Sequence, residues 1–320
     1  AKKIIQKVKI YTKRVHYEFE LRRNITIIRG DSATGKTTLV EMVQEYVNNP
    51  SGSPVNLICD KTCYVLSGAL WREQLSGMYD SIVFIDEGNE FIKTDEFARE
   101  IQQTDNYYVI VTRESLPSLP YSVEEIYGIR ESGKFKTLKQ RFHEFYQIYG
   151  MEDIQPDIRP ESIITEDSNS GFQFFDAVCK EHKLSCISAG GKSNVFQCLK
   201  NAGRNVLVVA DGAAFGAEID RVLQLIKIKE NAYLYLPESF EWMILTSGIV
   251  KDKELTDVLE NPSEFIESKE YFSWERFFTS LLTEKTKDTY LAYTKRKLNE
   301  VYLNEKEKRL LLDVMSKIEL

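Results

Sequence analysis

The stretch Gly30-Asp31-Ser32-Ala33-Thr34-Gly35-Lys36-Thr37 matches the pattern G-x-x-x-x-G-K-[ST] at every fixed position. A loop around the phosphates of a nucleotide must turn its backbone N–H groups inward, and its glycines permit the required dihedral angles and close approach. Lys36 is placed to reach the β- and γ-phosphates, and Thr37 to put its hydroxyl on Mg²⁺. The stretch therefore predicts a phosphate-binding loop, and we expect all eight residues and Thr38 to contact the nucleotide.

The residues on either side of this stretch favour the same interpretation. Residues 24–28 (Asn-Ile-Thr-Ile-Ile) predict a short buried strand, and residues 37–47 carry apolar side chains at helical spacing. The positive end of the helix dipole would add to the anion site. The alternative is a glycine turn that binds nothing, but a strand before the motif and a helix after it are the context that nucleotide binding requires.

The composition is that of an ordinary globular protein. A chain of 320 residues is long enough for two domains that each bury a core. No apolar run reaches the roughly 18 to 20 residues of a membrane span, and the lysine-rich start lacks the apolar segment of a signal peptide. We therefore expect a cytoplasmic protein without a membrane partner.

The charges and the cysteines exclude some other functions. The net charge of −7 gives no general basic surface for nucleic acid. The cysteines form neither a C-x-x-C framework nor a cluster with zinc spacing. We expect all five to be free thiols: Cys59, Cys63, Cys179, Cys186 and Cys198.

Residues 81–87 (Ser-Ile-Val-Phe-Ile-Asp-Glu) form an apolar strand that ends in two acids. Asp86 would hold Mg²⁺ through the outer shell, and Glu87 would orient or deprotonate the attacking water. Their distance from the phosphate loop allows the two strands to lie next to each other in a parallel sheet. A further strand, residues 107–111, is followed by Thr112, a candidate sensor of the γ-phosphate or of water, and by Arg113, which would contact phosphate or pair with a neighbouring acid.

These segments resemble the Walker A, Walker B and sensor segments of P-loop NTPases, in particular the additional-strand, catalytic-glutamate division. The resemblance covers roughly residues 1–130 in a reduced form. It implies ATP and Mg²⁺ as cofactors and an ATPase, that is, hydrolase, activity. An ABC-type signature is not convincing, because Met78-Tyr79 breaks the pattern that Leu75-Ser76-Gly77 begins.

We expect three regions and an α/β fold: residues 1–150, 151–250 and 251–320. Residues 135–149 predict an aromatic helix, and the glycine and prolines of residues 150–160 predict the domain boundary. Strand and helix then alternate four times, which predicts a small parallel sheet with helices on both faces. Residues from 261 onward predict a helical cap. Its Lys295-Arg296-Lys297 would lie on a solvated face, and the alternative is a contact with the backbone of a nucleic acid.

Acids follow two strands of the second sheet, where open α/β sheets build their sites: Glu166-Asp167 and Asp211. This arrangement resembles the TOPRIM domain of OLD-family nucleases. The similar segments are residues 163–167 (Ile-Ile-Thr-Glu-Asp), 188–195 (Ser-Ala-Gly-Gly-Lys-Ser-Asn-Val), 206–212 (Val-Leu-Val-Val-Ala-Asp-Gly) and 236–242 (Leu-Pro-Glu-Ser-Phe-Glu-Trp). The resemblance implies that Glu166 and Asp211 are catalytic, that both bind metal together with Glu241, and that Lys192 neutralises a phosphate.

Two departures separate the chain from that family. Ala213 stands where the family has an aspartate, and no glycine follows Glu166. They predict that one metal site is weakened or absent. Two alternatives therefore stay open: loop acids that are only solvated or cap helices, and a degenerate domain that binds nucleic acid or a partner without cutting.

The complete interpretation is an ATP-binding and ATP-hydrolysing protein whose nucleotide state controls a second site. That site would be a metal-dependent nuclease, with Mg²⁺ or Mn²⁺, acting on nucleic acid. The OLD-family resemblance implies a role in defence against phages or mobile elements, and we expect a homo-oligomer. The alternative is a non-cutting switch, in which ATP changes the affinity of the second domain for a protein partner or for nucleic acid.

Overall fold

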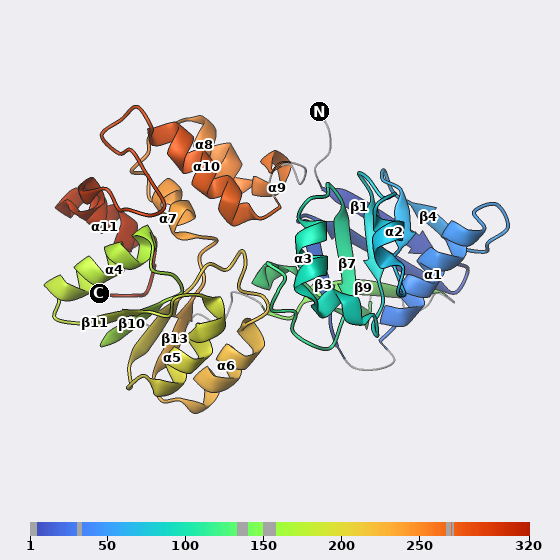
Figure 1. Cartoon of the computed structure of the whole chain (residues 1–320), viewed down its shortest axis with the longest axis horizontal. Coiled ribbons are helices and arrows are strands. Elements are labelled where there is room, and N and C mark those ends of the chain that lie inside the picture. Colours follow the sequence, from blue (N-terminus) through green and yellow to red (C-terminus); the bar gives the residue numbers. More distant parts are fainter. Residues whose placement is uncertain (1–4, 31–33, 133–139, 150–157, 267–269, 271) are drawn as a thin grey trace. The chain divides into compact units, whose positions relative to one another are not determined.

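A computed structural model of the chain describes residues 5–30, 34–132, 140–149, 158–266, 270 and 272–320. The chain divides into two compact units (Figure 1), one of Ala1–Gly150 with Ser263–Ser273 and one of Met151–Pro262 with Trp274–Leu320. The division falls between Gly150 and Met151, and most of the expected linker, residues 150–157, lies outside the described residues. None of the helices in the described part of the chain has the length and apolar character needed to cross a membrane.

The first unit contains a nine-stranded sheet with the order β4-β1-β2-β9-β8-β3-β7-β6-β5. Five neighbouring strands, from β8 to β5, are parallel to one another, whereas β1 is antiparallel to both of its neighbours and β9 is antiparallel to β8. The strands are β1 Gln6–Tyr11, β2 Val15–Leu21, β3 Ile25–Ile28, β4 Asn56–Ile58, β5 Cys63–Val65, β6 Ile82–Ile85, β7 Tyr107–Val111, β8 Ile126–Glu131 and β9 Arg141–Gln147.

Three α-helices accompany this sheet: α1 Lys36–Asn48, α2 Trp71–Leu75 and α3 Asp95–Ile101. The described residues between these strands also form two short 3₁₀ helices, Glu90–Lys93 and Val123–Glu125. The apolar face of α1, with Leu39 and Val43 fully buried, packs against β1, β4, β5 and β6. This packing fixes the start of α1 at the end of the central strands.

The expected position of the acidic strand is wrong in one respect. Strand β6, which carries Asp86, is not the neighbour of β3, because β7 lies between them and pairs with both in parallel register. All five residues of β7 are buried. A strand that is apolar on both faces gains most from a central place with a neighbour on each edge and packing on each side.

Residues 135–149 do not form a helix over the part that the structure describes. Residues 141–147 form strand β9, which pairs with β8 and with β2. Its rings stack on rings of β2, with centroid distances of 4.5 Å for Phe142 on His16 and 4.3 Å for Phe145 on Phe19. These cross-strand contacts favour the strand, and a short aromatic run has no periodicity that would have excluded it.

The second unit confirms the expected small parallel sheet. Its four strands have the order β11-β10-β12-β13, and every pair is parallel. They are β10 Ser162–Thr165, β11 Ser185–Ser188, β12 Val206–Val209 and β13 Ala232–Tyr235. Helix α4 covers one face and α5 and α6 cover the other (Figure 1). Their bounds are α4 Ser170–Glu181, α5 Val195–Asn201 and α6 Ile219–Ile228, and α7 spans Phe240–Thr246.

The C-terminal part is less helical than expected. The helices are α8 Glu254–Glu260, α9 Pro262–Phe265, α10 Trp274–Thr286 and α11 Glu305–Asp313, with a 3₁₀ helix at Glu300–Leu303. Residues 287–299 form no helix. Here the Thr286 hydroxyl accepts the N–H of Tyr293 at 3.1 Å, and Tyr293 is buried. Burial of this tyrosine therefore outweighs the helical pattern of the sequence.

Candidate functional site

The phosphate-loop motif lies between β3 and α1, as its sequence predicts. Gly30 and Gly35 have φ angles of 127° and 90°, in the region that favours glycine. Helix α1 begins at Lys36, so Thr37 and Thr38 are exposed on its first turn. Three of the expected nucleotide contacts, Asp31, Ser32 and Ala33, lie outside the described residues.

The side chain of Lys36 bends back into its own loop. It is only 5% exposed, and its Nζ donates to the carbonyl oxygen of Gly30 at 2.8 Å and to Oγ1 of Thr34 at 3.0 Å. Uncharged oxygens of the loop thus solvate the ammonium group. They hold it at the centre of the motif, where a phosphate would meet it.

Two aromatic side chains from the neighbouring strands support the loop. The hydroxyl of Tyr17 on β2 donates to the carbonyl oxygen of Gly35 at 2.8 Å. A Cβ atom at Gly35 would lie 2.7 Å from this hydroxyl. The ring of His143 on β9 stacks on Tyr17 with centroids 4.7 Å apart, and burial lowers the pKa of His143. This support could not be predicted from the sequence, because no local motif places Tyr17 and His143 beside the loop.

The acids expected at the end of β6 lie at the same sheet edge as the loop. Burial raises the pKa of Asp86, while the N–H of Glu87, which it accepts at 2.8 Å, and the charge of Lys36 act against the shift. Lys36 and Asp86 are therefore in electrostatic reach of each other. Oε1 of Glu87 lies 2.7 Å from Nε of Arg113, so Arg113 pairs with this acid.

Thr112 also lies at this edge, but its hydroxyl is engaged in its own turn. The side chain is 4% exposed, and its Oγ1 accepts the N–H of Glu114 at 3.1 Å. Its backbone N–H donates to Ile28 of β3 at 3.1 Å. Thr112 thereby fixes the end of β7 next to the strand that leads into the phosphate loop.

In the second unit the three expected acids, Glu166, Asp211 and Glu241, line one small pocket with a volume of about 30 Å³. Glu166 follows β10 and Asp211 follows β12, and these strands are paired so that their ends meet. Oε2 of Glu166 accepts the backbone N–H of Asp211 at 3.0 Å. Glu241 comes from the first turn of α7 and is 2% exposed.

Two further residues of this pocket, Tyr293 and Lys295, come from the non-helical segment 287–299. The Tyr293 hydroxyl lies 2.7 Å from Oε1 of Glu241 and 2.6 Å from the hydroxyl of Ser170. Nζ of Lys295 pairs with Glu275 of α10 and lies 3.9 Å from Oε1 of Glu241. The expected solvated helix face at Lys295 is therefore wrong.

The pocket contains more acidic than basic side chains. Burial raises the pKa of Glu166 to about 7. Burial and the carboxylates of Glu275, Glu166 and Glu241 raise the pKa of Asp211 well above its usual range. Burial alone would lower the pKa of Lys295, but the acids around it outweigh burial and raise it. Such a cluster favours the binding of a cation.

The donor set of this pocket supplies part of the ligands that one hard divalent cation needs. Glu166 and Asp211 offer carboxylate oxygens, the ligands that Mg²⁺ and Mn²⁺ prefer. Among the described residues there is no set of three or more His, Cys, Asp or Glu side chains arranged to hold a metal ion. Ala213 is buried and supplies no oxygen, and Glu241 is engaged by Tyr293. The pocket therefore does not fit a second ion.

The remaining expected residues have other partners. Asp167 accepts the N–H of Asn169 at 3.2 Å, which is the local turn role of a loop acid. Burial lowers the pKa of Lys192, whose Nζ donates to the carbonyl oxygen of Ala214 at 3.2 Å. Lys192 remains in electrostatic reach of Glu166.

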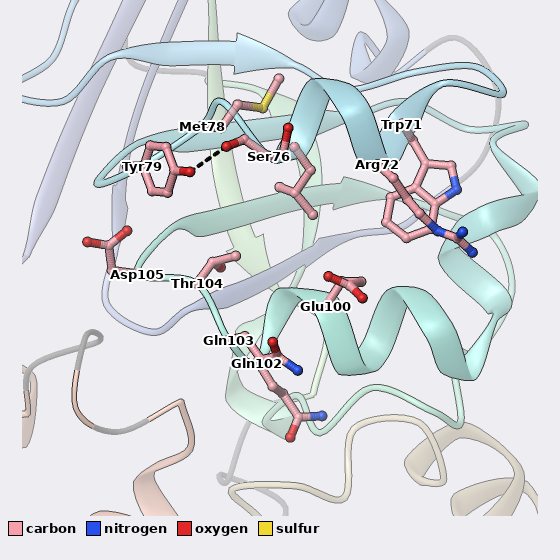
Figure 2. Close-up of a pocket in the computed structure, with 11 residues that line it drawn as sticks. Trp71, Arg72, Ser76, Met78, Tyr79, Glu100, Gln102, Gln103, Thr104 and Asp105 are labelled. Carbon is pink, nitrogen blue, oxygen red and sulfur yellow. Dashed lines mark hydrogen bonds between the residues drawn. The ribbon is translucent and has the colours of Figure 1, made fainter.

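A larger hollow of about 490 Å³ lies elsewhere in the first unit (Figure 2). Residues on its walls include Met78 and Tyr79, which precede β6, and Thr104 and Asp105, which precede β7. It therefore opens at the amino ends of these strands, whereas the phosphate loop and Asp86 lie at the carboxyl ends. None of the expected site residues lines this hollow.

Comparison of the chain with protein-family models and with curated proteins finds no match. Its function must therefore be argued from the two sites themselves.

Proposed function

We propose that the protein binds and hydrolyses ATP in its first unit. The observation that carries this proposal is that one edge of a parallel sheet holds the phosphate loop with Lys36, the strand end with Thr112, and the acids Asp86 and Glu87. The strand order β8-β3-β7-β6-β5, with one strand inserted between the loop strand and the acidic strand, supports membership of the additional-strand P-loop class.

In this proposal the loop amides and Lys36 bind the phosphates, and Thr37 and Asp86 hold Mg²⁺. The bound Mg²⁺ would neutralise developing charge on the phosphate oxygens. Glu87 orients the attacking water and accepts its proton, and the pairing of Arg113 with Glu87 keeps that carboxylate in place.

We propose further that the second unit is a TOPRIM-like nuclease site controlled by the nucleotide state of the first. The approach of Glu166, Asp211 and Glu241 to one pocket supports it. One Mg²⁺ or Mn²⁺ at Glu166 and Asp211 would polarise a phosphodiester group. The role in defence against phages or mobile elements rests on the OLD-family resemblance alone.

The second candidate is a switch that does not cut. Ala213 favours it, because this buried methyl group leaves the pocket without the additional carboxylate that a second metal ion requires. In this case ATP binding in the first unit would change the affinity of the second for nucleic acid or for a protein.

A cleavage assay decides between the two candidates. The full chain is incubated with Mg²⁺ or Mn²⁺ on single- and double-stranded DNA and RNA, with and without ATP. Glu166→Gln should lower the cleavage rate at least about a hundredfold, because a metal ligand supplies several kcal/mol of charge stabilisation. The same variant should still bind ATP, which uses the other unit.

Glu230→Gln is the matched control, since Glu230 is an exposed acid of the same unit, next to α6. It should cut like the wild type. A wild type that cuts none of these substrates would establish the switch as the better function. Equal cleavage after replacement of both Glu166 and Asp211 would show that the nuclease site lies elsewhere.

A further inference from the structure

We propose that Cys59 and Cys63 form an oxidisable dithiol, which a peroxide converts into an intramolecular disulfide. The pair is a modification site in the first unit, and it goes beyond the ATPase and nuclease functions proposed above. All five cysteines are free thiols in the structure. The inference therefore concerns the oxidised form of this one pair.

The two cysteines lie at the ends of one short turn. Cys59 directly follows β4 and Cys63 begins β5, and these are the two edge strands of the nine-stranded sheet. The turn is fixed on both sides, because Ile58 pairs with β1 and the carbonyl oxygen of Thr62 accepts the first N–H of β6 at 2.9 Å. The sheet therefore holds the two cysteines in place relative to each other.

Both thiols contact the same residue of this turn, and they also contact each other. Sγ of Cys59 accepts the backbone N–H of Lys61 at 3.5 Å, and Sγ of Cys63 donates to the carbonyl oxygen of Lys61 at 3.8 Å. A further hydrogen bond joins the two thiols directly. The side chain of Lys61 pairs with Asp80 and so anchors the turn between them. The two sulfur atoms that the disulfide would join are therefore neighbours in the reduced protein.

The two thiols differ in exposure and in ionisation. Cys59 is partly exposed and so open to a small oxidant, whereas Cys63 is only 6% exposed. The hydrogen bond from Cys63 lowers the pKa of Cys59 to about 7, and the same bond together with burial raises the pKa of Cys63. The thiolate is the nucleophile, and a thiol with a pKa of about 7 is about half ionised at pH 7. Cys59 is thus placed to react first and Cys63 second.

The reaction consumes one molecule of hydrogen peroxide for each disulfide. The Cys59 thiolate attacks one peroxide oxygen, the O–O bond breaks and hydroxide leaves, so that Cys59 becomes a sulfenic acid. The sulfur of Cys63 then attacks the sulfur of Cys59, the S–S bond forms, and the S–O bond breaks. The departing hydroxide takes the proton of Cys63 and leaves as water. Counting the proton that Cys59 gave up on ionisation, the peroxide gains two electrons from the thiols and becomes two molecules of water.

A second pair of hydrogen-bonded thiols, Cys179 on α4 and Cys186 on β11, lies in the second unit. There the hydrogen bond lowers the pKa of Cys179, but this cysteine is fully buried. The thiol that would have to react first is therefore closed to a peroxide. The fifth cysteine, Cys198 on α5, is partly exposed and supplies the control.

The test treats the reduced full chain with a small excess of hydrogen peroxide, blocks the remaining thiols with N-ethylmaleimide and digests the protein with trypsin. Trypsin cleaves after Lys61, so a disulfide between Cys59 and Cys63 links peptide 37–61 to peptide 62–72. We expect mass spectrometry to find this linked pair as the main product of both cysteines, and dithiothreitol to release it. Cys198→Ser is the matched control and should give the linked pair in the same yield.

Replacement of Cys63 separates the two steps. Cys63→Ser keeps a donor for Cys59 but no sulfur, so peroxide should leave Cys59 as a sulfenic acid, which dimedone traps. Cys63→Ala also lacks the donor, so the pH midpoint for alkylation of Cys59 by iodoacetamide should rise from about 7 toward about 8.5, the ordinary value of a thiol. If the buried serine prevents folding, the alanine variant still reports the sulfenic acid.

The product at Cys59 decides the inference. The linked pair in the wild type, with dimedone on Cys59 only after replacement of Cys63, would establish it. A stable sulfenic acid at Cys59 in the wild type would overturn it, because Cys63 would then not react with it. Cys59 left unmodified, or linked to a cysteine other than Cys63, would overturn it as well.

Discussion

Lys36 in the first unit and Lys295 in the second differ in the bonding partners that the structure describes for them. Lys36 bonds to the carbonyl oxygen of Gly30 and the hydroxyl of Thr34, which carry no charge. Lys295 lies between the carboxylates of Glu275 and Glu241. A phosphate can replace uncharged oxygens without leaving an ion unpaired, whereas Lys295 already pairs with a carboxylate. The first site is thus suited to an anion and the second to a cation.

The largest effect in this comparison is expected from Lys36→Ala. The variant should bind Mg·ATP more than about a hundredfold more weakly. The reason is that the ammonium group would lose its charge-assisted hydrogen bonds to the β- and γ-phosphates, which are worth about 1.5–3 kcal/mol each. Titration calorimetry gives the affinity, and circular dichroism confirms the fold.

Lys7→Ala is the control for this prediction. Lys7 is an exposed lysine of β1 in the same unit. Its removal should leave the affinity for ATP unchanged. A folded Lys36→Ala protein with wild-type affinity for ATP would contradict the assignment of an anion site to Lys36.

The next largest effect is expected from Glu87→Gln. Glutamine keeps an oxygen for Arg113 but cannot take a proton from water, so ATP should still bind while turnover falls about a hundredfold. Release of inorganic phosphate measures the rate. Glu90→Gln, an exposed acid three residues further on, should turn over normally. Near-normal turnover of Glu87→Gln would leave the first site as a binding site without this catalytic group.

The two sites also differ in how far the sequence predicts them. The phosphate loop is eight consecutive residues, and its requirements are local: glycines at positive φ, a strand before and a helix after. The acids of the second site could be predicted because parallel strands deliver their carboxyl ends to one edge, and Glu166 and Asp211 do meet there.

The rest depends on contacts that no local pattern encodes. Tyr293 and Lys295 reach the acids only because residues 287–299 leave the helical path and α4 binds them. Strand β9 forms because its rings find partners on β2, far away in the sequence. Periodicity describes one segment at a time. It therefore predicts the strands and helices of the second sheet well, but it does not predict contacts between distant segments, such as those of β9 with β2.

The smallest effects are expected from two tyrosine variants, one in each unit. Tyr293 donates to a buried carboxylate at 2.7 Å, and Tyr17 donates to an uncharged carbonyl oxygen at 2.8 Å. Tyr293→Phe should lower the free energy of unfolding of the second unit by about 1.5–3 kcal/mol, the value for a bond to a charged group. Tyr17→Phe should lower that of the first unit by only about 0.5–1.5 kcal/mol.

Because the chain divides into two compact units, each free energy is measured by hydrogen exchange of the unit's own peptides across a urea series. Phenylalanine keeps the ring of each tyrosine, so the difference isolates the hydroxyl. Added Mn²⁺ should reduce the loss in Tyr293→Phe, since a cation can take up the charge of the acid that the hydroxyl no longer contacts. It should leave Tyr17→Phe unchanged. Equal losses in the free energy of unfolding of the two variants, unchanged by Mn²⁺, would contradict this prediction. They would mean that packing stabilises the second pocket and that the charge of Glu241 adds nothing to the hydrogen bond of Tyr293.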